Sequence, residues 1–89
     1  MTDKPFPVPT IHSNGTSREQ LLDQVCQAHF AVIKAVEALE RAAPNGRDYY
    51  PQGNSALKLA TEAHHARVVK LVDVLVELAR LAEEIADAP

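Results

Sequence analysis

The chain has a single cysteine among its 89 residues. Cys26 has no partner for an intrachain disulfide, and a lone cysteine in a chain rich in alanine, valine and leucine is typical of a reducing compartment. A chain of this length forms at most one small domain, whose core is marginal unless disulfides, metals or association add stability. The missing disulfide therefore favours association.

Long apolar runs and clustered basic residues are also missing. Residues 1–10 contain three prolines and no apolar run, so we expect no signal peptide. A membrane span needs about 20 predominantly apolar residues, whereas charged residues recur every turn in the second half of this chain. The net charge is −3, with Lys and Arg dispersed among Asp and Glu. We therefore expect a cytoplasmic protein that binds neither a membrane nor a nucleic acid duplex.

The motifs of common catalytic and cofactor sites do not occur. The chain has no HExxH, no GxxxxGK[ST], no GxGxxG and no nucleophile elbow. Cys26 and His29 share a helical face, and His64 and His65 follow later, but adjacent histidines on a helix point about 100° apart and no second pair completes a zinc set. We expect no enzyme activity, no catalytic residue, no cofactor and no metal.

Apolar spacing predicts two long helices joined by a loop. The first helix spans about residues 17–43, the loop residues 44–54 and the second helix about residues 55–87. Residues 1–15, with alternating prolines, form an extended arm, and residues 16–89 form the hairpin. The expected fold is all-α: two long antiparallel helices with a proline-rich N-terminal arm.

Capping signals mark the start of both helices. Thr16 and Glu19 fit a capping box at the first helix, which ends before Pro44. Either Asn54 or Ser55 can cap the second helix.

The first helix carries one regular seam, at alternating spacings of three and four: Leu22, Val25, His29, Val32, Val36, Leu39 and Ala43. In a hairpin centred on the loop, opposed residue numbers sum to about 99, which places His29 about one turn from Arg67. Both can then share a layer with His64. We interpret these three as a polar core that sets register and partner number, with ligand contact as the alternative.

The second helix is apolar around most of its circumference. Six of its charged residues recur at spacings of three and four and so lie on one narrow stripe: Lys70, Asp73, Glu77, Arg80, Glu84 and Asp87. A helix that is apolar on nearly all sides must be covered on nearly all sides, and the hairpin supplies only one other long helix. We therefore expect a homo-oligomeric helical bundle with coiled-coil packing. A dimer would form a four-helix bundle, and higher cyclic or dihedral states fit equally well.

The loop and the end of the arm contain the residues best suited to a ligand. Arg47 can pair with phosphate or carboxylate, and two adjacent tyrosines offer faces on which a base can stack. The candidate ligand-binding residues are His12, Asn14, Thr16, Asn45, Arg47, Asp48, Tyr49, Tyr50 and Gln52. In the alternative interpretation, Asp48 pairs with Arg47 and a tyrosine packs across the end of the hairpin.

These residues fall into two groups at opposite ends of the hairpin, about 40 Å apart. One site can contain both groups only if a second copy runs antiparallel and brings its loop beside the arm of the first. We therefore expect any such site to lie between subunits.

Two short segments resemble those of a group of small phage and prophage proteins. Residues 12–16 read HSNGT and match H-x-N-G-T, and residues 45–53 read NGRDYYPQG and match N-x-R-D-Y-Y-x-Q-G. The resemblance implies the cytoplasm of a bacterial host during infection and an accessory role, with no catalytic residue to carry over.

Taken together, the residues and the resemblance favour a non-enzymatic counter-defence protein. It would act as a sponge that binds a small anionic ligand, such as a nucleotide immune signal, at sites between subunits. Two other interpretations stay open: an inhibitor that binds a host defence protein, and a virion or assembly component.

Overall fold

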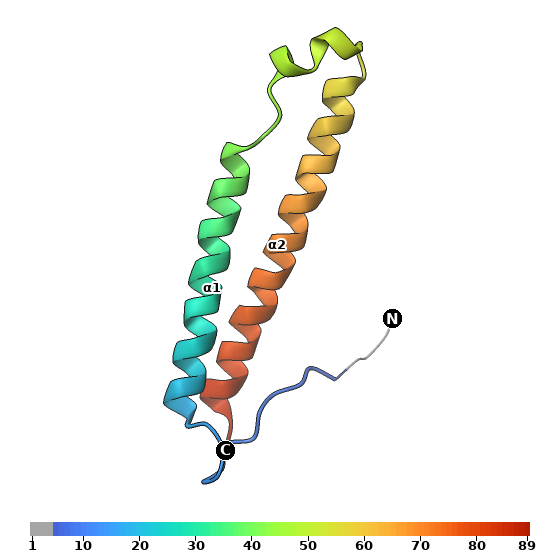
Figure 1. The fold of residues 1–89 in the computed structure, drawn as a ribbon. Coiled ribbons are helices and arrows are strands. Elements are labelled where there is room, and N and C mark those ends of the chain that lie inside the picture. The colour runs from blue at the N-terminus through green and yellow to red at the C-terminus, as the bar shows by residue number, and fades with distance from the viewer. Residues whose placement is uncertain (1–4) are drawn as a thin grey trace.

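The computed structural model describes residues 5–89 as two long antiparallel helices that lie side by side (Figure 1). Helix α1 spans Arg18–Arg41 and helix α2 spans Ala56–Asp87. Two short 3₁₀ helices, η1 (Gly46–Asp48) and η2 (Tyr50–Gln52), lie in the connection. The expected all-α hairpin is confirmed. Residues 1–4 of the expected arm lie outside the described part.

Both helices begin and end within two residues of their expected bounds, but the caps differ in detail. The N-cap of α1 is Ser17, whose hydroxyl oxygen accepts a hydrogen bond from the backbone N–H of Gln20 at 3.1 Å. The N-cap therefore lies one residue later than the capping box expected from Thr16 and Glu19. Ser55 precedes α2 without a side-chain cap bond.

The end of the hairpin opposite the connection is held together by Arg18. Its Nε donates to the carbonyl oxygen of Ile85 at 3.3 Å, and its Nη2 donates to the carbonyl oxygen of Ala88. The arm contacts α2 near the same end, where the guanidinium carbon of Arg80 lies 4.1 Å from the centre of the Phe6 ring. This cation–π contact fixes part of the arm on α2.

The hairpin has a seam but almost no interior. Within residues 5–89, Ile85 alone is buried, at 1 % exposure. Half-buried apolar residues line the seam: Leu22, Val25, Val32, Val36 and Leu39 on α1, and Val68, Leu71, Leu75, Leu78 and Ala82 on α2. Eight large apolar residues are between 37 % and 75 % exposed: Phe30, Tyr50, Leu57, Leu59, Val69, Val72, Val74 and Val76. None of the helices in the described range has the length and apolar character that a bilayer crossing requires.

Candidate functional site

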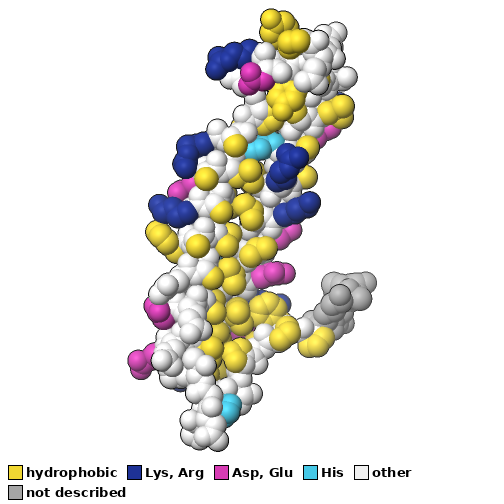
Figure 2. Space-filling model, in the orientation of Figure 1, with side chains coloured by type: hydrophobic (Ala, Val, Ile, Leu, Met, Phe, Trp, Pro, Cys, Tyr) yellow, Lys and Arg dark blue, Asp and Glu magenta, His cyan; other side chains and the backbone are white. Residues whose placement is uncertain are grey.

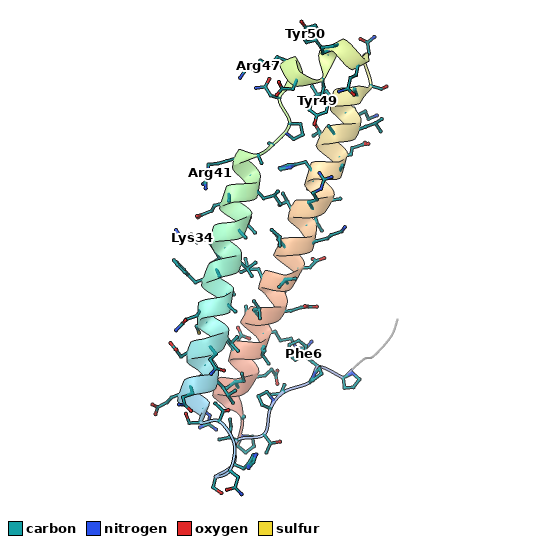
Figure 3. The ribbon with its side chains drawn as sticks, viewed as in Figure 1. Phe6, Lys34, Arg41, Arg47, Tyr49 and Tyr50 are labelled. Atoms are coloured by element: carbon teal, nitrogen blue, oxygen red, sulfur yellow. The ribbon has the colours of Figure 1, made fainter. Side chains whose placement is uncertain are left out.

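The connection between α1 and α2 forms a groove at one end of the molecule (Figure 3). The groove has a volume of about 380 Å³ and is lined by Gly46, Arg47, Tyr50, Gly53, Asn54 and Leu57. Two of the predicted ligand-binding residues, Arg47 and Tyr50, are among them. Leu57 was not among the predicted residues, because an apolar side chain within the expected second helix gives no signal of a ligand site.

Short turns position the two predicted residues. The side-chain Oδ1 of Asn45 accepts a hydrogen bond from the backbone N–H of Arg47 at 3.0 Å and caps η1. The backbone N–H of Asp48 donates to the carbonyl oxygen of Asn45 at 3.0 Å, and that of Tyr49 donates to Gly46 at 3.1 Å. Asn45 therefore organises the turn, and the side chain of Arg47 stays available.

Gly53 ends η2 and starts the approach to α2. Its backbone N–H donates to the carbonyl oxygen of Tyr50 at 3.2 Å. Its φ of 111° and ψ of 174° lie in a region that is essentially confined to glycine. The groove therefore depends on a backbone conformation that other residues adopt only with strain.

We expect Gly53→Ala to lower the free energy of unfolding by about 1–2 kcal/mol, because the strained backbone conformation becomes unfavourable. A Cβ at position 53 would meet no atom within 4 Å, so the effect is one of backbone conformation and not of packing. Gly46→Ala is the matched control, since its Cβ would lie an ordinary 3.5 Å from Cδ2 of Leu57. Urea denaturation measures both variants, and equal stabilities would contradict the assignment.

Arg47 has no ion-pair partner in the part of the chain that the structure describes. Across residues 5–89 the one ion pair joins Lys34 and Glu37 on α1, at 3.6 Å. The alternative in which Asp48 neutralises Arg47 is therefore not found.

The two tyrosines of the connection differ in exposure. Tyr50 is 75 % exposed and projects at the end of the molecule, whereas the half-buried Tyr49 turns back toward the helices (Figure 3). Tyr49 therefore fits the alternative of a tyrosine that packs across the hairpin end, and Tyr50 is the one that presents its ring. The groove combines a cation without an ion pair and an exposed aromatic face.

The remaining predicted residues of the connection do not line the groove. Asn45 caps η1, as described, while Asp48 and Gln52 are exposed beside it. The candidate site in the connection is therefore smaller than the sequence suggested.

His12, Asn14 and Thr16 lie at the other end of a molecule that is 62 Å long. The backbone N–H of Gly15 donates to the carbonyl oxygen of His12 at 3.1 Å, which closes a tight turn. A Cβ on Gly15 would lie 2.8 Å from Nε2 of His12, so the imidazole packs directly on this glycine. Within one chain, this segment forms a turn that does not approach the connection.

A second groove lies at this end, between the arm and α2. It has a volume of about 530 Å³ and is lined by Val8, Pro9, Thr10, Ile11, Glu84, Asp87, Ala88 and Pro89. Two carboxylates line it, and none of the three predicted residues does. The acidic lining disfavours an anion, so anion binding is supported only at the connection.

The predicted polar core is not formed within the hairpin. His29 and His64 are half-buried, whereas Arg67 is exposed. Because Arg18 contacts Ile85, opposed residue numbers sum to about 103 and not 99. His29 and His64 are then about 15 Å apart along the helix axes. The two histidines belong to different layers of the seam.

Comparison with protein families, with curated proteins and with solved structures finds no match to this chain. The interpretation of the groove therefore rests on its own residues. They supply one guanidinium, one aromatic ring, one amide and one aliphatic side chain, together with two glycines.

Proposed function

We propose that this protein is a non-enzymatic binding module for a small anionic ligand with a planar ring, of the nucleotide class. The observation that carries the proposal is the guanidinium of Arg47, which lines the groove without an ion pair beside the exposed ring of Tyr50. A guanidinium pairs bidentately with phosphate, and stacking on an aromatic side chain contributes about 1–3 kcal/mol per base. The groove volume, about 380 Å³, suits a ligand of this size.

The composition of the groove supports binding without chemistry. Its lining residues include no carboxylate, imidazole, thiol or amine, so the phenol of Tyr50 has no general base beside it in the groove. The amide of Asn54 adds hydrogen-bond donors and an acceptor, which is suited to the edge of a base. Leu57 adds an apolar wall.

The resemblance to phage and prophage proteins supports a setting for this activity. Five of the six lining residues fall within or directly after the segment of residues 45–53 that carries the resemblance. We propose that the protein acts in the cytoplasm of an infected bacterium as a counter-defence sponge that lowers the concentration of a nucleotide signal. The grooves of an oligomer would hold the ligand between or beside its subunits.

A thermal-shift screen with cyclic dinucleotides, ADP-ribose and inorganic phosphate tests the proposal. We expect at least one nucleotide to raise the melting temperature, because a ligand that binds only the folded state stabilises it. Failure of every nucleotide in the panel at millimolar concentration would count against the proposed function.

For the nucleotide found in that screen, we expect Arg47→Ala to weaken binding at least about tenfold, because a charge-assisted hydrogen bond to the ligand is lost. Isothermal titration calorimetry gives the dissociation constant. Arg41→Ala is the matched control, since Arg41 is an exposed arginine on α1 that does not line the groove. Equal losses in the two variants would point to a general effect of charge and not to the groove.

A further inference from the structure

One face of α1 carries a row of alanines. Ala28, Ala31, Ala35, Ala38 and Ala42 recur at alternating spacings of three and four, and all five are exposed. The first four each directly precede a half-buried residue of the α1–α2 seam, so the row adjoins that seam. This spacing is typical of the contact stripe in a coiled coil, and small side chains let two helices approach closely. We call this row the alanine face.

A single chain, with its extended arm, exposes more surface than a compact folded monomer of its mass. Its accessible surface is 6917 Å², whereas a compact monomer of the same mass exposes about 5,100 Å². The excess is about 1,800 Å², and a stable interface of standard size buries about 800 Å² of each partner. The chain thus has the free surface that a large interface requires.

Charge divides the hairpin into two unequal halves. Residues 34–70, the half nearer the connection, contain six Lys or Arg and four Asp or Glu. Residues 5–33 and 71–89, the other half, contain two Lys or Arg and seven Asp or Glu. Figure 2 shows the basic side chains gathered toward the connection, with acidic ones predominating toward the opposite end. An antiparallel second copy therefore places each basic half on an acidic half, whereas a parallel copy opposes like charges.

We propose that a second copy of this chain docks antiparallel on the alanine face, with α1 against α1 about a two-fold axis at Ala35. The alanine face is centred on Ala35, so facing residue numbers sum to 70 and the contact is self-complementary. The product is a four-helix bundle in which the two α1 helices pack together and the two α2 helices lie on the same side of that pair. The assembly does not depend on the proposed ligand.

The register of this assembly makes the two hairpins overlap over their full length. Arg18 of the second copy lies about 51 Å along the axis from Arg18 of the first. Ala56, where α2 begins, lies about 44 Å from Ile85 on the same scale. Each connection is therefore level with the arm end of the other copy. Along the helix axis, the groove of Arg47 is thus level with the acidic groove of the second copy.

Disulfide cross-linking tests both the face and the direction. The exposed native thiol is first removed by Cys26→Ser. In that background we expect Ala35→Cys to form a covalent dimer on mild oxidation, because the facing Cα atoms lie within the range of about 4.4–6.8 Å that a disulfide spans. Ala28→Cys alone stays uncross-linked, because its two copies are about 21 Å apart along the axis. A mixture of Ala28→Cys and Ala42→Cys cross-links between the two variants.

Each outcome decides the proposal. Self-cross-linking of Ala28→Cys as readily as of Ala35→Cys indicates a parallel dimer and overturns the antiparallel arrangement. Absence of cross-linking of Ala35→Cys, with helix content by circular dichroism unchanged, overturns the alanine face. Light scattering of the unsubstituted chain is expected to give twice the chain mass, and a stable monomer at micromolar concentration would refute the assembly. Failure of the nucleotide screen leaves all three measurements interpretable, because none uses a ligand.

Discussion

Ile85→Ala is expected to lower the free energy of unfolding by about 3 kcal/mol. Ile85 is 1 % exposed and is the one buried side chain within residues 5–89. The hydrogen bond from Nε of Arg18 to its carbonyl oxygen holds the backbone in place, so the neighbouring chain cannot close the cavity freely. Urea denaturation at a fixed protein concentration measures the change, since the stability of the proposed dimer would depend on concentration.

Val76→Ala on the same helix is the control for this substitution. Val76 is 63 % exposed, and surface substitutions usually change stability by no more than about 0.5 kcal/mol. Losses of equal size at Val76 and Ile85 would contradict the conclusion that stability is concentrated at the clamped end of the hairpin.

Ala35→Glu is expected to weaken self-association by at least about 100-fold. At the two-fold axis, the two introduced carboxylates would face each other, and juxtaposed like charges at an interface are unfavourable by several kcal/mol. The longer side chain also keeps the two α1 helices apart. Sedimentation equilibrium gives the dissociation constant of the dimer.

The matched control is Ala66→Glu, which introduces the same change at an exposed alanine of α2. Ala66 follows the half-buried His64 by two residues, so it lies on the side of α2 that faces away from α1. We expect its dissociation constant to stay within about threefold of the unsubstituted value. Retained association of Ala35→Glu, with helix content unchanged, would exclude the alanine face as the interface.

The helices and their ends were accessible from the sequence because they depend on local signals. Regular apolar spacing defines α1 and α2, and Pro44 and Ser17 bound the first of them within two residues. The rotation of α2 about its own axis could not be predicted from the sequence. Because this helix is apolar on most sides, several rotations satisfy the same pattern, and the sequence placed Arg67 in a layer with His29 and His64, where the structure exposes it.

The axial offset between α1 and α2 could not be predicted from the sequence for a related reason. The connection takes up two 3₁₀ helices, and α2, with 32 residues, is longer than α1, with 24. The axial offset between α1 and α2 is instead fixed by Arg18, at the end of the hairpin opposite the connection. The hydrogen bond of Arg18 to a main-chain carbonyl leaves no trace in apolar spacing, so the predicted layer of His29, His64 and Arg67 had the wrong register.

Residue chemistry predicted nine candidate ligand-binding residues, of which two, Arg47 and Tyr50, line the groove. The roles of their neighbours depend on geometry that spacing does not specify. The turn of η1 makes Asn45 a cap, and η2 directs Tyr49 inward while Tyr50 points outward. Whether Asp48 pairs with Arg47 is likewise a matter of side-chain directions, and in the structure no ion pair joins them.

The small number of buried side chains in the lone hairpin has a consequence for its behaviour in a cell. Within residues 5–89 a lone copy buries one side chain, so before it forms the proposed dimer it would have little free energy to resist proteases. At low concentration, copies would be degraded before they form the proposed dimer. Rapid synthesis would raise the concentration above the dissociation constant, and most copies would then be in the longer-lived dimer. The amount of protein in the cell would therefore rise steeply once its rate of synthesis exceeds a threshold.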